Sequence, residues 1–239
     1  MPTPSMRSST GAPTWGMADV AAGLGIAVAA SVIVGSIVSA AAGYEHTSEI
    51  PLWVIALLQI PLWLGLLGVP IWAARAKGHG LVADFGFTMQ LVDVPVGAVT
   101  GVLCQVIAVP LVSWPMLQLL GKDSDDLEKP ARELADKAHG PGVLLLVLVV
   151  VVGAPLIEEL FFRGLTLRSV TRRFGAPAGV VGSAVLFGLT HFEPLQLPAL
   201  VVFGLLAAFL ARRSGRLGPA IWAHVAFNLT AVIQLLADR

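Results

Sequence analysis

Residues 143–164 read VLLLVLVVVVGAPLIEELFFRG and decide what kind of protein this is. Ten aliphatic residues in succession open the stretch, and two adjacent glutamates and an arginine follow in equally apolar surroundings. An apolar run of about 20 residues is long enough to cross the hydrocarbon core of a bilayer as a helix. Ionisable side chains inside such a helix are costly and indicate function by default. The stretch therefore predicts a membrane-spanning helix that carries a functional site.

The composition of the whole chain also indicates a membrane protein. Residues of the AVILMFWYC set make up 56% of the 239 residues and charged residues only 13%, against about a quarter charged in soluble domains. One soluble core could not bury this much apolar surface, so lipid must cover much of it. Fifteen Lys and Arg balance fifteen Asp and Glu, so no excess of positive charge argues for a nucleic-acid partner. The single cysteine, Cys104, excludes an intrachain disulfide and a cysteine-rich zinc module.

Apolar runs along the chain predict about seven membrane-spanning helices, within a range of six to eight. Pro110 and Pro115 are expected to kink or split the third run, because each removes a helical hydrogen-bond donor. Gly97 and Gly101 form a small-xxx-small pair, which favours close helix packing. The predicted fold class is an all-α, polytopic integral membrane bundle. The seven runs cover residues 18–42, 51–74, 94–120, 143–173, 178–191, 197–211 and 217–236.

Four segments are predicted along the chain. Residues 1–16 are rich in Pro, Ser, Thr and Gly and are expected to form a disordered tail. Residues 17–120 hold the first membrane helices, and residues 141–239 are expected to be the catalytic membrane core. Between them, residues 121–140 contain ten of the thirty charges and must lie outside the lipid. Their apolar residues repeat at helical spacing, which predicts a short surface helix.

The charges of the loops predict the orientation in the membrane. The loops at 43–50 and 192–196 contain no Lys or Arg, whereas those at 75–92, 168–177 and 212–216 contain two, three and three. Cytoplasmic loops carry the excess of basic residues. We therefore expect a bacterial plasma-membrane protein with a cytoplasmic N-terminus and, after seven spans, an outer C-terminus. The charged loop after the third span would lie outside, and its four basic residues run against the rule.

Polar residues on three predicted helices form the candidate site. Glu159 and Arg163 are four residues apart, so they share one helix face and can pair. Glu158 is turned from Glu159 by about 100° and is free to contact a different neighbour. His224 and Asn228 are also four apart, and together they can donate two hydrogen bonds to one oxygen, as an oxyanion hole requires.

Counting residues from the turns brings these side chains to a common depth. Glu159 lies sixteen residues before the turn at Gly175 and His191 sixteen residues after it, which is about 24 Å in each case. His224 and Asn228 lie about 15–21 Å from the next turn on the same side. We therefore expect one shared cavity, opening toward the cytoplasmic half of the membrane.

Three motifs in this order, Glu158-Glu159-x-x-x-Arg163, Phe187-x-x-x-His191 and His224-x-x-x-Asn228, resemble those of the CPBP family of intramembrane proteases. The family includes the type II CAAX prenyl endopeptidases and bacterial relatives linked to bacteriocin processing or self-immunity. The resemblance covers about residues 143–236. It implies hydrolysis of a peptide bond in or near the membrane.

The resemblance also implies a role for each residue. Glu158 would be the general base that activates water, helped by His191. His224 and Asn228 would stabilise the oxyanion of the tetrahedral intermediate. The residues themselves allow the same roles, because burial makes a carboxylate a stronger base and strengthens hydrogen bonds to an oxyanion.

A metal ion is the main alternative to this mechanism. The family is often called a metalloprotease family, and Glu158, His191 and His224 could supply three zinc ligands. In either case, the resemblance implies that Glu159 and Arg163 hold the site together. Zinc would leave no separate general base except Glu159, which faces Arg163. We therefore favour glutamate-activated water without a cofactor, and keep zinc as the alternative.

The resemblance does not specify the substrate. The expected partners are the lipid bilayer and a peptide or membrane-protein segment, prenylated as in CAAX processing or not. Two other functions compete with the protease. Buried Glu, Arg and His could form the proton or ion relay of a transporter, although the chain shows no inverted repeat or paired broken helices. A non-catalytic immunity or scaffold protein on the same fold is the third alternative.

Overall fold

Six helices of the computed structural model, which describes residues 11–238, are long and apolar enough to cross a membrane. The described residues contain no strand. A further apolar helix, α11 (Ala176–Leu189), occupies the place of the fifth predicted span but is shorter than the six. The chain is therefore an all-α, polytopic integral membrane protein, as predicted. The six long helices are Met17–Ala42, Leu52–Ala76, Asp93–Leu120, Pro141–Phe174, Leu197–Ser214 and Gly218–Ala237.

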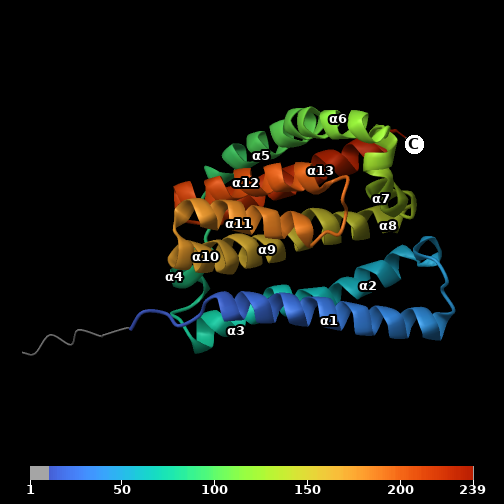
Figure 1. Cartoon of the computed structure of the whole chain (residues 1–239). Helices are drawn as coiled ribbons and strands as arrows, with labels where there is room; N and C mark the ends of the chain where they lie inside the picture. Colours follow the sequence, from blue (N-terminus) through green and yellow to red (C-terminus); the bar gives the residue numbers. More distant parts are fainter. Residues whose placement is uncertain (1–10, 239) are drawn as a thin grey trace, which may run out of the picture.

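The first half of the chain forms a hairpin and then the third span (Figure 1). Its elements are α1 (Met17–Ala42), η1 (Thr47–Glu49), α2 (Leu52–Trp63), η2 (Leu64–Gly68), α3 (Val69–Ala76), α4 (Leu81–Phe85), α5 (Asp93–Leu103), η3 (Cys104–Ala108) and α6 (Val109–Leu120).

The second half holds the candidate site residues on α9, η5 and α13 and in the loop after α11. Its elements are α7 (Ser124–Asp136), α8 (Pro141–Leu146), η4 (Val147–Gly153), α9 (Ala154–Glu159), η5 (Leu160–Thr166), α10 (Leu167–Phe174), α11, α12 (Leu197–Ser214) and α13 (Gly218–Ala237). The helix α7 lies in the charged segment where the apolar spacing predicts a surface helix.

The third predicted span is not split by its prolines. The π-helical turn η3 joins α5 to α6, and Pro110 is the second residue after it, so one helix runs over residues 93–120. A proline lacks the backbone N–H and clashes with the carbonyl four residues earlier, and a wider turn relieves both problems. The same arrangement recurs where η2 precedes Pro70 and η4 precedes Pro155. The number of spans, and with it the alternation of loops, is preserved.

Close contact between α5 and α13 fixes the helix that carries His224. A Cβ atom added at Gly97 would lie 2.5 Å from the Trp222 Cβ, and one at Gly101 would lie 2.8 Å from the Phe227 backbone nitrogen. Only glycine therefore permits this separation of the two helices. The predicted role of the glycine pair in close packing is confirmed.

The loops gather at two ends of the bundle. At one end, which we call the basic end, Arg216 pairs with Asp93 (2.5 Å) and Lys77 pairs with Asp19 (2.6 Å). These contacts join the α12–α13 turn to the start of α5, and the end of α3 to the start of α1. The loops predicted to be cytoplasmic thus lie together (Figure 1).

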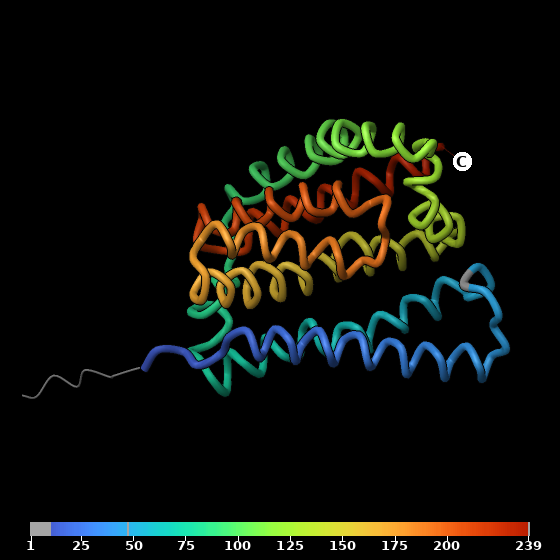
Figure 2. Tube along the Cα trace, viewed as in Figure 1, coloured from blue at the N-terminus to red at the C-terminus, as the bar shows by residue number. Residues whose placement is uncertain are grey.

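The opposite end, which we call the α7 end, holds the other loops. Lys137, after α7, donates to the Ser48 and Ile50 carbonyl oxygens, and Gln196, before α12, donates to the Leu127 carbonyl oxygen (3.0 Å). Figure 2 shows the start of the described chain at the basic end and its C-terminus at the α7 end. The loops therefore alternate between the two ends as their charges predict.

The predicted disordered tail, residues 1–16, lies mostly outside the described residues, which begin at 11. Its last residues differ from the prediction. Trp15 is only 4% exposed and packs against Phe85, with ring centroids 4.9 Å apart. The Arg172 guanidinium lies 3.7 Å from the centroid of the Trp15 ring and donates to the Trp15 carbonyl oxygen. Composition alone could not reveal this contact with α10, which is 157 residues away along the chain.

Candidate active site

Glu159 and Arg163 form a fully buried ion pair, as their spacing predicts. Both side chains are 0% exposed, and Arg163 Nη1 donates to Glu159 Oε1 over 2.6 Å. Arg163 Nη2 donates to the Gly204 carbonyl oxygen of α12 (3.3 Å). The same Glu159 oxygen lies 2.8 Å from Nδ1 of His224 on α13. One carboxylate and one guanidinium therefore tie three helices together.

His224 connects the two adjacent glutamates. Its Nδ1 faces Glu159, and its Nε2 lies 3.8 Å from Oε2 of Glu158. Because an ionised carboxylate only accepts hydrogen bonds, we assign the Nδ1 proton to the contact with Glu159. This contact fixes the ring so that Nε2 points toward Glu158. No arginine among residues 11–238 forms an ion pair with Glu158, and Glu158 faces a different nitrogen of His224 from Glu159, which fits the predicted rotation of about 100°.

Phe187 positions both histidines. Its ring centroid lies 4.7 Å from that of His191 and 5.6 Å from that of His224, both in edge-on geometry. The Arg163 guanidinium lies 4.5 Å from the centroid of the same ring, a distance typical of cation–π contact. His191 Nδ1 lies 2.8 Å from the Phe187 carbonyl oxygen, which can only accept. The Nδ1 proton therefore goes to this bond, and Nε2 is left to act on a ligand.

Asn228 lies one turn after His224 on α13. Its Nδ2 donates to the Val150 carbonyl oxygen of η4 over 2.8 Å. A side-chain amide has two N–H donors, so this bond leaves a second donor and holds the amide in place.

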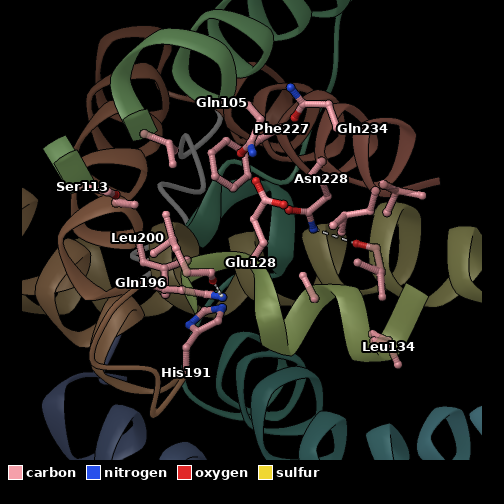
Figure 3. A pocket seen from close by; sticks show the side chains of 18 of the residues that line it. Gln105, Ser113, Glu128, Leu134, His191, Gln196, Leu200, Phe227, Asn228 and Gln234 are labelled. Atoms are coloured by element: carbon pink, nitrogen blue, oxygen red, sulfur yellow. Dashed lines mark hydrogen bonds between the residues drawn. The ribbon is translucent and has the colours of Figure 1, made fainter. Parts of the chain in front are cut away.

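Four of the six candidate residues line one cavity of about 690 Å³. They are Glu158, His191, His224 and Asn228, and Figure 3 shows His191 and Asn228 beside it. Glu159 and Arg163 do not line it. The structure thus brings all six residues together but divides them into a buried pair and a set that faces the cavity.

The cavity runs from Glu158 to the α7 end. Residue counting predicts an opening toward the cytoplasmic half, which corresponds to the basic end, so this prediction is wrong. Its far lining includes Lys122, Asp123 and Ser124, which are exposed. On the basic side of Glu158, all seven residues of η5 are buried and fill the space. Counting residues gives the depth of a side chain in the membrane, but it does not show toward which end of the bundle a cavity at that depth opens.

Polar residues outside the predicted motifs also line the cavity, among them Gln105, Ser113 and Gln196 (Figure 3). Ser113 is 1% exposed, and its hydroxyl has no hydrogen-bond partner among the described residues. Gln105 could have been found from the sequence, because it is a polar side chain within a membrane span. Ser113 and Gln196 carry no such signal, since a serine in a helix and a glutamine in a short loop are common.

The proposed zinc ligands do not fit a metal centre in this arrangement. Among residues 11–238, no three His, Cys, Asp or Glu side chains come together in a way that could hold a metal ion. Glu158 Oε2 and His224 Nε2 lie 3.8 Å apart, and His191 does not join them in such a group. A catalytic zinc needs about three protein ligands around one point.

The comparisons with known proteins concern the part of the chain that carries these residues. Residues 140–230 match the family model described as "Type II CAAX prenyl endopeptidase Rce1-like". The Bacillus subtilis protein described as "Putative membrane peptidase YdiL" is 29% identical over 94 residues, which are 39% of this chain and 38% of that protein. The chain therefore spans well under half of that relative. No solved structure matches the chain. All six candidate residues fall within 140–230, and the resemblance of this part to the CPBP family is confirmed.

Proposed function

We propose that the protein is an intramembrane endopeptidase in which Glu158 activates water to hydrolyse a peptide bond. The observation that carries the proposal is the different surroundings of two adjacent glutamates. Glu159 is neutralised by Arg163 and closed off, while Glu158 faces the cavity beside His224. A general base must reach the substrate and must not be committed to an ion pair. The likeness of residues 140–230 to membrane peptidases supports the same class of reaction.

The reaction follows from the groups that face the cavity. A water molecule hydrogen-bonded to Glu158 attacks the carbonyl carbon of the scissile peptide bond, and its proton passes to the Glu158 carboxylate. His191 helps to orient this water through Nε2. The tetrahedral intermediate then collapses, the C–N bond breaks, and Glu158 returns the proton to the leaving amine. Water and one peptide give a carboxylic acid and an amine, which together ionise to a carboxylate and an ammonium group.

His224 and Asn228 stabilise the negative charge that develops on the carbonyl oxygen. Asn228 offers its second N–H, and the bond of the first to Val150 keeps it oriented. His224 faces the cavity through Nε2, and the bond of its Nδ1 to Glu159 keeps the ring oriented. Donors that are already in place cost no reorganisation during the reaction, which makes such contacts effective.

The proposal includes no metal ion and no cofactor. Glu158 cannot be a zinc ligand and a free general base at once, and its position in the cavity beside His224 supports the role of the base. The substrate is a peptide or a membrane-protein segment with apolar side chains, because the cavity walls between Glu158 and α7 are mostly apolar. The main wall residues are Leu117, Leu127, Leu134, Leu146, Val149, Phe227, Val232 and Leu235.

The test is a cleavage assay with the purified protein in lipid vesicles. Wild type and Glu158→Gln are incubated with a library of membrane peptides, and the products are identified by mass spectrometry. We expect new termini with the wild type and none with the variant. Ion or proton flux through wild-type vesicles without any cleavage would contradict the protease and support the transporter.

A further inference from the structure

The two ends of the bundle carry opposite charge. Among residues 11–238, the basic end has eight basic residues and three carboxylates, and these carboxylates are all buried. The α7 end has four basic residues and ten carboxylates. The basic end holds Arg75, Lys77, Arg168, Arg172, Arg173, Arg212, Arg213 and Arg216, with Asp19, Asp84 and Asp93; the carboxylates of the α7 end are Glu45, Glu49, Asp123, Asp125, Asp126, Glu128, Glu133, Asp136, Glu193 and Asp238.

This difference fixes which end faces the cytoplasm. Short loops with many Lys and Arg stay on the cytoplasmic side of a membrane protein, and acidic residues contribute little to the orientation. Eight basic residues against four place the basic end in the cytoplasm and the α7 end outside. The four basic residues of the α7 end sit in the one segment that also contains six acidic residues, 122–137.

The cavity is continuous with the α7 end and closed at the basic end. From Glu158 its lining passes along α13 and under α7 to the exposed residues Lys122 and Asp123. In the other direction, the buried pair of Glu159 and Arg163 and the packed side chains of η5 separate it from the basic loops. A peptide can therefore reach Glu158 only from the α7 end or from the lipid beside it.

The helix α7 covers this entrance. Its side chains Leu127, Leu134 and Ala135 line the cavity, and so does Glu128, which pairs with the partly buried Arg132 (2.7 Å). Side-chain hydrogen bonds at its two ends link it to other loops, from Gln196 to the Leu127 carbonyl oxygen and from Lys137 to the α1–α2 loop.

We infer that substrate reaches the catalytic cavity from the extracytoplasmic face, past α7, and that this substrate is an exported peptide or an outer segment of a membrane protein. The inference rests on the proposed function for the reaction, but its direction rests on the charges and the cavity alone. A cytoplasmic protein with a prenylated C-terminus would meet the closed basic side of the site and could reach Glu158 only through the lipid beside the cavity.

The first test locates the two ends in intact cells. Cys104 is the single cysteine of the chain and is buried, so Cys104→Ala provides a cysteine-free background. Ser124→Cys reports on the cavity entrance, and Arg213→Cys is the matched exposed position at the basic end. With a membrane-impermeant maleimide, we expect labelling of the Ser124→Cys protein in intact cells and of the Arg213→Cys protein only after lysis. The reverse pattern would overturn the inference.

The second test asks from which face cleavage is possible. The Ser124→Cys protein is reconstituted in vesicles, right-side-out and inside-out preparations are separated, and each receives a quenched apolar peptide that cannot cross the membrane. We expect cleavage only where the α7 end faces the added peptide, and we expect the impermeant maleimide to stop it. Cleavage only in the opposite preparation would overturn the inference. No cleavage in either, with labelling as expected, would contradict the proposed protease and leave the orientation established.

Discussion

The adjacent glutamates Glu158 and Glu159 lie on two sides of one helix turn, and their surroundings differ completely. On one side, Glu159 is paired with Arg163, contacts His224 and has no exposed surface. On the other, Glu158 faces a cavity, and its carboxylate lies near Nε2 of His224, the ring nitrogen that points away from Glu159. A rotation of about 100° along the helix separates a carboxylate that holds helices together from one that can meet a substrate. Identical side chains therefore acquire different roles from packing alone.

The Glu159 face of the helix, which we call the closed side, contains an ion pair inside the membrane bundle, where burial of a charge costs free energy. Transfer of Glu159 and Arg163 from water into the bundle costs several kcal/mol for each ion, and their mutual attraction offsets this only while both are present. The Glu158 face, which we call the open side, does not carry this cost in free energy, because Glu158 can be hydrated in the cavity. Predictions about stability therefore belong to the first side and predictions about catalysis to the second.

Replacement of Glu158 by glutamine should have the largest effect on activity. The amide has the same shape but cannot take a proton from water, so we expect the cleavage rate to fall by about 10²–10⁴-fold, the usual contribution of a general base. Folded yield and melting temperature in detergent should stay at the wild-type values. The measurement is the initial rate per mole of folded protein.

The neighbouring substitution Glu159→Gln is the matched control. It leaves Arg163 buried without a counter-charge, so it should lower the folded yield. If Glu158→Gln retained full activity, the assignment of the general base would be wrong. If both variants lost folded protein equally, the contrast between the two sides would disappear.

Removal of the guanidinium in Arg163→Ala should have the next largest effect. Breaking a buried ion pair from one side costs about 3–5 kcal/mol, and this variant also loses the contact with Phe187 and the bond to Gly204. Unfolding by denaturant in mixed micelles measures the loss of free energy of unfolding.

Arg216→Ala provides the control for this loss. Arg216 also pairs with a buried carboxylate, Asp93, but the Arg216 side chain is 21% exposed. Its removal therefore opens Asp93 to water, which can solvate the carboxylate. We expect a smaller loss of stability than for Arg163→Ala. An equal loss in the two variants would show that burial of the arginine does not determine the cost.

The local part of this contrast could be predicted from the sequence. The pairing of Glu159 with Arg163 and the separate direction of Glu158 follow from helix geometry within six residues. The common depth of the site residues follows from counting along helices. The contact of His224 with both glutamates could not be predicted, because it depends on how α13 is rotated against α9, and no local pattern specifies that rotation.

Other parts of the structure depended on contacts between distant segments. Trp15 is ordered by Arg172, so the composition of the tail was a poor guide to its last residues. The π-turn before Pro110 preserves the third span, although proline usually breaks a helix. The direction of the cavity depends on the side chains of η5 and α7, whose packing cannot be read from hydropathy.

Replacement of Asn228 by alanine should reduce catalysis more than stability. Loss of one oxyanion donor lowers kcat by about 10²–10³-fold in other hydrolases, and KM should change little because the donor acts mainly in the transition state. Thr230→Val is the control on the same helix, since Thr230 bonds only the Ala226 carbonyl oxygen one turn away and does not line the cavity. A fall in stability without a fall in kcat per folded molecule would assign Asn228 to the closed side, through its bond to Val150.

The smallest effect is expected from removal of metal ions, which should leave the cleavage rate unchanged. Glu158 is the free base of the open side only if it is not a ligand, and Glu158, His191 and His224 do not form a group that could hold a metal ion. The measurement pairs exhaustive chelation with metal analysis of the same purified sample, and Glu158→Gln gives the background rate. Stoichiometric zinc whose removal abolishes activity, and whose return restores it, would convert Glu158 from a base into a ligand. The open side would then be defined by a metal-bound water and not by a hydrated carboxylate, while the closed pair of Glu159 and Arg163 would keep its role, because that role depends on burial and charge alone.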